Sequence, residues 1–447
     1  MEFAGQRVRG TIRWVLASPV TKNAGSLYAT QAARYILPLI VVPYLVRVLG
    51  PANYGLVAFG QGLIAYLTVF LNYGFDWSAS RKVAAYQSEA GKIGQIASAV
   101  WTAKLCLCVL CFVILFLLML TNTRLHSAAA LLFILSGILI GNMLFPIWLF
   151  SGMERMGAIA GINLLGRAVG TIAIFLFVRH RSDFLVYAAI LSFQSVVSGL
   201  TGVGFARWKL QIKLRRPSLR EVTRELKDGF VLFLSSSAIS LYTAGNAFIL
   251  GLFAGDMAVG YFAAAERIVK AIVSLFDPIS QAVFPRFSKL AVTSRPKSML
   301  WARRMLKLQG SLGLTCTLAI LTFTEPICTL VLGPQYKASV PVMRILAALP
   351  LLIAISNVLG VQVMIPFHRD RAVFAFVAAA GVINIGLAAL LAPVHGAVGM
   401  AEAILCSELI VTAGFLIYLS SVGLNPVRGN SRSDSGELAR SIEAPES

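Results

Sequence analysis

Charge is scarce in this chain, and acidic charge is the scarcest. Only 13% of the 447 residues are charged, and 19 Asp and Glu stand against 39 Lys and Arg. A soluble domain carries about 25% charged residues, whereas here the hydrophobic fraction is 57% and the mean hydropathy is +0.79. Because so few charges cannot cover the surface of a soluble globular protein, the apolar surface must face lipid. The composition predicts a multi-pass membrane protein.

Cysteine and histidine are equally sparse. Three of the six cysteines, Cys106, Cys108 and Cys111, lie within an apolar run without a histidine nearby, which indicates buried unpaired thiols and no metal site. The four histidines are scattered singly, and the chain has no Walker A pattern. No compact apolar run with a cleavage site follows the first basic residues, so no signal peptide is expected. These absences predict a non-enzyme with no metal or cofactor and no direct use of ATP.

Long apolar stretches are what the chain has in abundance. A membrane-crossing helix needs about 20 apolar residues, and that window gives twelve candidate spans. We therefore predict an all-α integral membrane protein with twelve transmembrane helices in two six-helix lobes around a central cleft. The predicted spans are 25–47, 54–77, 97–120, 127–150, 158–178, 184–206, 229–253, 258–283, 308–332, 341–366, 372–392 and 398–420. The predicted domains are an N-terminal cytoplasmic segment 1–22, an N-lobe 23–206, a basic cytoplasmic linker 207–228, a C-lobe 229–420 and a disordered cytoplasmic tail 421–447.

The placement of the basic residues sets the orientation. With both termini in the cytoplasm, most Lys and Arg outside the spans fall inside, above all in the connections 207–228 and 286–307. Those that fall on the other side are Arg47, Arg124, Arg179, Arg181 and Lys337. The positive-inside rule favours this topology. The net charge of +20 is thereby explained without a nucleic-acid partner, and the linker suits a helix on the anionic face of the bilayer.

A short sequence echo supports two related halves. The second predicted span begins with Gly50-Pro51 and continues to Gly55, and the eighth begins with Gly255-Asp256 and continues to Gly260. Both are glycine-bearing turns that open the second helix of a half, as in transporters built from repeats.

Basic side chains inside apolar stretches are the candidates for function. A charge at the bilayer centre costs about 2.5–3.5 kcal/mol on insertion scales, so each must line a wet cavity, pair with a carboxylate or extend to the interface. We predict that four of them, Arg34, Arg167, Arg267 and Lys270, form a cationic substrate-binding cavity. Lys104 and Arg344 lie near span ends and are expected to anchor there. Polar residues at helical spacing that would share the cavity are Gln31, Gln61, Asn72, Asn163, Ser274 and Gln281.

Three carboxylates are candidates for coupling to a proton or sodium ion: Asp277, Glu402 and Glu408. A competing interpretation of the eighth span is an internal ion-pair network, with Lys270 bound to Asp277 or Arg267 bound to Glu266. An excess of cations in the cavity would favour an anionic substrate such as a phosphate, pyrophosphate or acidic sugar.

Five segments in order resemble the polysaccharide flippases (Wzx-type, O-antigen and exopolysaccharide translocases) of the multidrug/oligosaccharidyl-lipid/polysaccharide superfamily, MOP. They are PYLVRVLGPANYGLVAFGQ at 43–61, NYGFDWSASRKVA at 72–84, WLFSGMERMGAIAGINLLGRAVG at 148–170, GYFAAAERIVKAIVSLFDPISQAVFPRFSKL at 260–290 and LGPQYKASVPVMRILAALP at 332–350. The resemblance spans about residues 23–420. It implies alternating access, an undecaprenyl-pyrophosphate-linked oligosaccharide as substrate, a bacterial inner-membrane location, and polysaccharide polymerase or assembly proteins as partners.

Two other functions compete with this interpretation. A multidrug or other small-molecule antiporter of the same superfamily predicts that carboxylates outnumber the cations in the cavity. A membrane glycan polymerase or glycosyltransferase predicts acidic or histidine groups on a sizeable outer loop, and the outer connections here are short. A passive scaffold would leave the buried cations unexplained.

Overall fold

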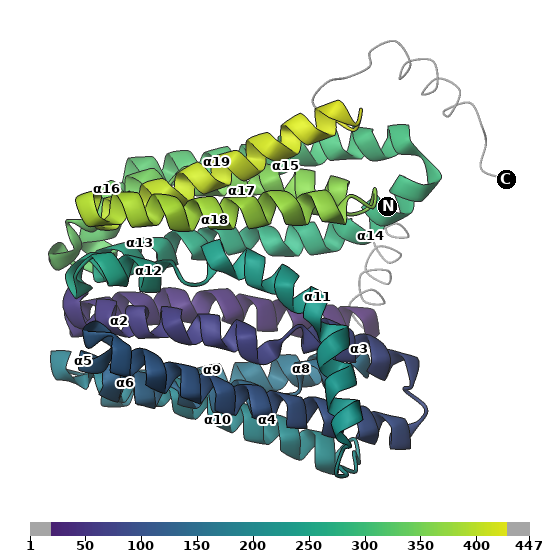
Figure 1. Ribbon diagram of the computed structural model, residues 1–447. Helices are drawn as coiled ribbons and strands as arrows, with labels where there is room; N and C mark the ends of the chain where they lie inside the picture. The colour runs from purple at the N-terminus through teal and green to yellow at the C-terminus, as the bar shows by residue number, and fades with distance from the viewer. Residues whose placement is uncertain (1–18, 427–447) are drawn as a thin grey trace, which may run out of the picture. The chain divides into compact units, whose positions relative to one another are not determined.

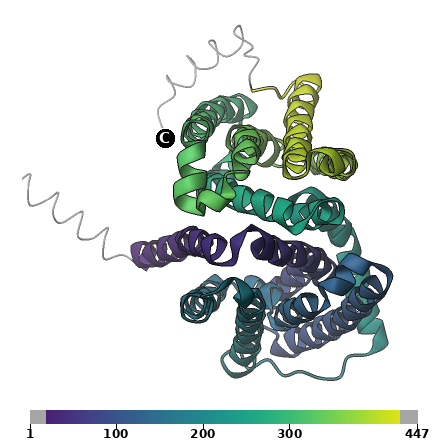
Figure 2. The ribbon, with the colours of Figure 1, turned by 90° about the vertical axis from the view of Figure 1, so that its left-hand side faces the viewer.

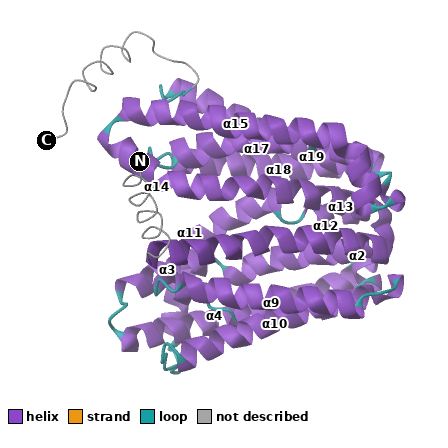
Figure 3. Cartoon of the chain, turned by 180° about the vertical axis from the view of Figure 1, so that it is seen from behind, coloured by secondary structure: helices purple, strands orange, loops and turns teal. Residues whose placement is uncertain are grey.

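The part of the chain described by the computed structural model, residues 19–426, is predominantly helical and contains no strand (Figure 3). Side chains are described in this part except those of residues 19–39, 235, 238, 239, 241, 242, 281 and 282. Nine helical segments in it are long and apolar enough to cross a membrane. The predicted all-α integral membrane class is confirmed.

The predicted count of twelve spans stays a prediction, since nine segments meet the criterion of length and apolarity among the described residues. One of the nine, Ile40–Ala85, includes the second predicted span and the end of the first. The seventh and eighth predicted spans do not meet the criterion. Their helices carry charges, among them Glu266, Arg267 and Lys270, which lower the hydropathy.

The chain divides into two compact units. Unit 1 comprises the described part of Met1–Leu49 together with Leu63–Ser236, and unit 2 comprises Gly50–Gly62 together with the described part of Ser237–Ser447. Two helices therefore contribute to both units. They are α2 (Pro19–Asn72), which is kinked at Gly50, and α11 (Leu219–Thr243).

Unit 1 is a bundle of long and short helices (Figure 1). Besides its parts of α2 and α11, it contains α3 (Phe75–Ala85), α4 (Ala90–Thr121), α5 (Thr123–Ser127), α6 (Ala129–Leu135), α7 (Gly137–Leu144), α8 (Ile147–Gly152), α9 (Met156–Phe177), η1 (Arg181–Asp183) and α10 (Phe184–Trp208). Gly141 and Gly199 allow α7 and α10 to approach closely, because an added Cβ on Gly199 would lie 2.6 Å from the Gly141 carbonyl oxygen. Ser192 adds an interhelical hydrogen bond to the Ile134 carbonyl at 2.6 Å. Such small and hydroxyl side chains are the usual contacts between helices in lipid.

Unit 2 contains α12 (Asn246–Phe253), α13 (Asp256–Val273), η2 (Ser274–Phe276), α14 (Asp277–Thr293), α15 (Arg295–Pro326), η3 (Ile327–Leu332), η4 (Pro334–Tyr336), α16 (Ser339–Leu346), α17 (Leu349–Asn357), η5 (Val358–Met364), α18 (Asp370–His395) and α19 (Ala397–Ser421). Helices α18 and α19 lie side by side as a hairpin (Figure 2). A core that includes Phe287, Met305, Val363, Val411 and Phe415 joins α14, α15, η5, α18 and α19. Both η3 and η5 are π-helical, a wider winding that is frequent at functional sites.

The connection between the sixth and seventh predicted spans differs from the expected surface helix over 207–228. Helix α10 continues to Trp208, residues 209–218 form no helix, and α11 runs from Leu219 into the seventh span without interruption. Ser218 and Glu221 form a capping box: the Ser218 N–H donates to Glu221 Oε2 at 2.8 Å and the Glu221 N–H donates to Ser218 Oγ at 3.3 Å. This cap satisfies main-chain donors at the start of α11.

The tail begins as ordered chain. Arg295 donates a hydrogen bond to the Gly423 carbonyl and Arg303 donates one to the Pro426 carbonyl, each at 2.8 Å. Residues up to 426 therefore lie against α15. The disorder predicted for the remainder of 421–447, and most of the predicted segment 1–22, concern positions outside the described residues.

Candidate functional site

The seventh predicted span is broken in the middle. Helix α11 ends at Thr243 and α12 begins at Asn246, so carbonyl groups near the end of α11 lack partners within the helix. The Lys270 ammonium on α13 donates to the Thr243 carbonyl at 2.9 Å. A cation at this position also interacts favourably with the negative end of the helix dipole. Interrupted helices of this kind mark binding sites in transporters.

Glu266 completes this arrangement. Its Oε1 lies 2.9 Å from Lys270 Nζ and accepts a hydrogen bond from Asn246 Nδ2 at 3.2 Å. We call Asn246, Glu266, Lys270 and the Thr243 carbonyl the broken-span site. The Lys270 side chain is 52% exposed and that of Glu266 is 14% exposed. The Lys270 ammonium group is therefore accessible to a ligand, while the largely buried Glu266 carboxylate fixes its position.

Lys270 has a carboxylate partner within the eighth span, as the competing ion-pair interpretation expected. The partner is Glu266, four residues earlier on the same helix, whereas that interpretation named Asp277. Arg267 is exposed on the same helix. Within this turn of α13, two cations stand against one carboxylate. This face of α13 thus presents two basic side chains, Arg267 and Lys270, about one turn apart.

The rest of the predicted stripe on the eighth span has other local roles. The Ser274 hydroxyl donates to the Ala271 carbonyl at 2.6 Å, so it is bound to its own helix. Asp277 is exposed and begins α14 after the short turn η2. The side chain of Gln281 lies outside the described residues.

The other predicted cavity residues lie on α2 and α9. Arg34 and Gln31 belong to α2, but their side chains are outside the described residues. Gln61 and Asn72 are half-buried, the first in unit 2 and the second in unit 1. Asn163 and Arg167 are half-buried one turn apart on α9. That these residues meet the broken-span site in a common cavity stays a prediction.

Lys104 does not extend to the interface as predicted. Its side chain is only 1% exposed, and its ammonium donates to the Asn142 carbonyl of α7 at 2.7 Å. The acceptor lies where the fourth span is interrupted, between α7 and α8. Trp101 donates to the Leu144 carbonyl at 3.2 Å in the same interruption. In each unit a lysine thus binds a carbonyl beside a broken helix, Lys104 in unit 1 and Lys270 in unit 2.

Arg344 has a surface role. Its guanidinium lies 2.9 Å from Glu325 Oε1, and the side chains are 55% and 69% exposed. Exposed pairs of this kind contribute about 0–1 kcal/mol. This position fits the expected anchor at a span end.

Glu408 occupies the interior of unit 2. It is 6% exposed, and its Oε1 accepts a hydrogen bond from Ser356 at 2.7 Å. In the α18–α19 hairpin, Gly399 contacts Leu391 and Gly414 contacts Phe376. This register sets Asn384 of α18 level with Glu408 of α19.

A fourth helix, α15, contributes a polar side chain at the same height along the helices. Gly313 of α15 contacts Pro350, Leu351 and Ala354, which sets Gln309 level with Ser356. Gln309 and Asn384 are fully buried, and neither side-chain amide has a hydrogen-bond partner among the described residues. We call Gln309, Ser356, Asn384 and Glu408 the buried polar layer. Unpartnered buried amides are rare and costly, so Gln309 and Asn384 are each suited to bind a buried water molecule.

Polar groups continue beside this layer on α14, α17 and η5. Ser280 accepts hydrogen bonds from Asn357 at 3.0 Å and from Gln362 at 3.3 Å. Gln362 lies in the π-helical turn η5.

Glu402 differs from Glu408. Its Oε2 lies 3.0 Å from His395 Nδ1 near the turn between α18 and α19, and both side chains are partly exposed. Of these two candidate coupling carboxylates, Glu408 is the internal one.

The sequence interpretation missed Asn246, Gln309, Asn384 and the burial of Lys104. The spacing of Glu266 and Lys270, four residues apart, was a signal for their ion pair. The seventh span is interrupted at 244–245, where the sequence has a single glycine, Gly245, and no proline. A hydropathy window therefore passes over the interruption.

Comparisons with known proteins agree with this architecture. A model of the family described as polysaccharide biosynthesis protein matches residues 20–291. The chain is 33% identical over 398 residues to a protein of Escherichia coli (strain K12) named "Putative O-antigen transporter". That alignment covers 89% of this chain and 96% of the relative.

The fold is similar to those of solved membrane transporters. A structure of the lipid II flippase MurJ in an inward closed conformation aligns with a TM-score of 0.72 at 14% identity, over 95% of this chain and 93% of that one. An inward-facing MATE family transporter of the MOP superfamily aligns with a TM-score of 0.65 at 16% identity, over 88% of this chain and 95% of that one. At these identities the likeness concerns the fold alone.

Proposed function

Because the chain belongs to the polysaccharide biosynthesis protein family, we propose that it is a flippase for a lipid-linked glycan. Its substrate would be an undecaprenyl-pyrophosphate-linked oligosaccharide, moved from the cytoplasmic to the periplasmic leaflet of a bacterial inner membrane. Both chain termini would be cytoplasmic. Polysaccharide polymerase or assembly proteins would take up the product.

The observation that supports this proposal most is the broken-span site. Lys270 and Arg267 place two exposed basic side chains on one face of α13, and Lys270 remains half-exposed although Glu266 binds it. Phosphate oxygens are strong acceptors for ammonium and guanidinium groups, especially where water is scarce. A multidrug antiporter for cationic compounds would place the opposite charge at this face.

Transport would proceed by alternating access. The pyrophosphate and sugars would bind the cationic residues Arg34, Arg167, Arg267 and Lys270, while the polyprenyl chain stays in lipid. Because a ligand shifts a conformational equilibrium only through its different affinity for the two states, the site must bind the pyrophosphate differently on the two sides.

Glu408 is the coupling group that we propose among the three candidate carboxylates. It is buried with one hydrogen bond from Ser356 and with the unpartnered amides of Gln309 and Asn384 at its level. A buried carboxylate without a countercharge is costly, so the group binds either a proton or a cation such as sodium. Moving one charge through 100 mV supplies about 2.3 kcal/mol. Asp277 and Glu402, both more exposed, rank below it.

Complementation of a strain that lacks its own glycan flippase tests the function. Wild-type protein should restore glycan export, whereas Arg267→Ala and Lys270→Ala should reduce it about tenfold or more, because a hydrogen bond to a charged group contributes about 1.5–3 kcal/mol. Lys289→Ala, an exposed lysine on α14, is the matched control. Normal export by both variants at normal membrane levels would contradict the proposal.

A further inference from the structure

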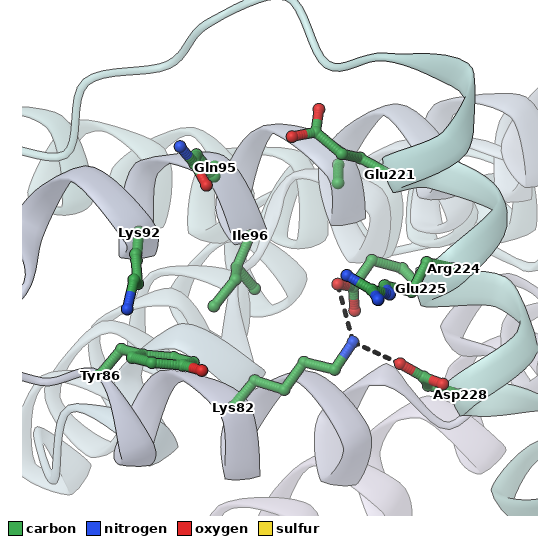
Figure 4. Close-up of a pocket in the computed structure, with 10 residues that line it drawn as sticks. Lys82, Tyr86, Lys92, Gln95, Ile96, Glu221, Arg224, Glu225 and Asp228 are labelled. Carbon is green, nitrogen blue, oxygen red and sulfur yellow. Dashed lines mark hydrogen bonds and ion pairs between the residues drawn. The ribbon is translucent and has the colours of Figure 1, made fainter.

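A pocket of about 400 Å³ is formed within unit 1 by residues that belong neither to the broken-span site nor to the buried polar layer. It is formed by the end of α3, the start of α4 and the first turns of α11 (Figure 4). Its charged lining residues are Lys82, Lys92, Glu221, Arg224, Glu225 and Asp228. We call it the α3–α11 pocket.

One wall of the pocket carries an excess of negative charge. Lys82 Nζ lies 2.8 Å from Glu225 Oε1 and 2.7 Å from Asp228 Oδ2, so one ammonium serves two carboxylates (Figure 4). Glu225 is 5% exposed, and its Oε2 has no hydrogen-bond partner among the described residues. A buried carboxylate oxygen without a donor is costly, and a ligand with an N–H donor would satisfy it.

A positively charged side chain lies on the same turn of α11. The Arg224 guanidinium lines the pocket and makes no hydrogen bond or ion pair with any residue that the structure describes. The remaining charges are compensated locally: Lys92 pairs with Glu89 at 2.9 Å, and Glu221 pairs with Arg215. The uncompensated groups are therefore one carboxylate oxygen and one guanidinium.

The position of the pocket indicates the kind of molecule that reaches it. It lies where the apolar segment Ile40–Ala85 ends and the segment Ala90–Thr121 begins, which is the level of lipid headgroups. Exposed Trp77 on α3 and Trp208 at the end of α10, 70% and 82% exposed, fit that level, because tryptophan concentrates at the membrane–water interface.

We propose that the α3–α11 pocket binds the headgroup of an aminophospholipid, with its phosphate on Arg224 and its ammonium on Glu225 and Asp228. The pocket offers one positive and one negative site, and this headgroup carries one charge of each sign. Its acyl chains would remain in the bilayer beside α3 and α4. This inference does not depend on the transported substrate.

The test is a competition among lipids with identical acyl chains. Full-length protein in detergent would be mixed with equal amounts of phosphatidylethanolamine, phosphatidylcholine and phosphatidylglycerol, and bound lipid counted by native mass spectrometry. Phosphatidylethanolamine should bind about tenfold more tightly than the others, since methylation removes the N–H donors and glycerol lacks the charge. Equal binding of the three lipids would overturn the proposal.

Two variants test the phosphate site and the ammonium site of the pocket separately. Arg224→Ala should weaken binding of phosphatidylethanolamine about tenfold, while Arg220→Ala, an exposed arginine of α11 outside the pocket, should not. Glu225→Gln keeps an oxygen for Lys82 and should bring phosphatidylethanolamine and phosphatidylcholine to equal affinity. The proposal fails if Arg224→Ala and Arg220→Ala bind alike, or if Glu225→Gln keeps the preference.

Free phosphoethanolamine distinguishes a lipid from a soluble ligand of the same chemistry. Added at the concentration of the lipid, it should displace little phosphatidylethanolamine, since it lacks the acyl chains. Displacement with equal affinity would overturn the assignment to a lipid. Thermal unfolding of each variant, compared with the wild type, checks that the fold is retained.

Discussion

Gly55 and Gly260 occupy equivalent positions in the two short sequence motifs, and the structure brings these motifs into reciprocal contact within unit 2. A Cβ added to Gly55 would lie 1.9 Å from the Asp256 carbonyl oxygen, and one added to Gly260 would lie 1.9 Å from the Pro51 carbonyl oxygen. Asp256 and Pro51 are themselves equivalent positions of the two motifs. The sequence echo therefore reflects a contact between backbones that only glycine allows.

This contact gives the first prediction. Gly55→Ala and Gly260→Ala should each reduce the free energy of unfolding by about 1–3 kcal/mol, because the backbones must separate to accept a methyl group. Thermal unfolding of the purified protein measures the change. Gly386→Ala on α18, where nothing lies within 4 Å of the added Cβ, should leave the protein as stable or slightly more stable. Equal stability of Gly55→Ala and the control would contradict the close approach.

Lys104 gives the second prediction. Lys104→Met keeps the length of the side chain but leaves the Asn142 carbonyl without its ammonium donor. The loss should be about 1.5–3 kcal/mol, the usual contribution of a hydrogen bond to a charged group, and should appear as a lower unfolding temperature. The exposed Lys337→Met serves as control. A Lys104→Met protein as stable as wild type would show that the buried ammonium is not needed to stabilise the interrupted fourth span.

The capping box of α11 predicts a dependence on pH. The Ser218 main-chain N–H, and after it the Arg215 guanidinium and the Ser218 hydroxyl, hold the pKa of Glu221 below its ordinary value of 4.5. A lowered pKa in the folded state means that the stabilisation is present above pH 4.5 and is lost as the pH falls through the lower folded value. Hydrogen exchange of residues 219–224 should therefore accelerate in that acidic range, relative to intrinsic exchange.

Glu221→Gln is the control for this pH effect. It removes the titrating group, so the protection of the first turn should no longer change across the same range. An identical pH profile in the variant and the wild type would assign the change to other groups.

The sequence predicted the all-helical membrane class because hydropathy and helix length follow directly from composition. It also identified Arg267 and Lys270 as basic positions in an otherwise apolar span, and their role in binding a substrate stays a prediction. It could not predict where helices break within a span. This holds for the break at 244–245, where no proline lies and Lys270 of another helix binds a carbonyl beside the break. The break at 145–146 does have a sequence signal, because Pro146 lacks the N–H that would donate to the Asn142 carbonyl, and Lys104 donates to that carbonyl instead.

The carboxylates show the same limit of prediction from the sequence. Glu402 and Glu408 have similar apolar neighbours in the sequence, yet Glu402 meets His395 near a turn whereas Glu408 faces Ser356 inside unit 2. The difference is set by helix register and hairpin packing, which a single segment does not encode. The close approach of Gly55 and Gly260 likewise requires both motifs at once.

Glu408 gives the fourth prediction. Glu408→Gln keeps an oxygen for the Ser356 hydroxyl but cannot release a proton or balance a cation. The variant should fold and bind substrate, yet glycan translocation in proteoliposomes should no longer respond to an imposed proton or sodium gradient. Glu402→Gln should keep that response. A gradient response retained in Glu408→Gln would move the coupling role elsewhere.

The most direct test of the central claim, that Arg267 and Lys270 of α13 bind the pyrophosphate, is a translocation assay in proteoliposomes with two lipid-linked glycans. They would carry the same glycan and polyprenol, one through a pyrophosphate and one through a neutral linkage. The double variant Arg267→Gln with Lys270→Gln should slow the pyrophosphate-linked substrate about tenfold or more, while the slower neutral substrate should be unaffected. A control with Lys289→Gln and Lys297→Gln should transport both as wild type does. Equal losses for the two substrates, or no loss for either, would contradict the account.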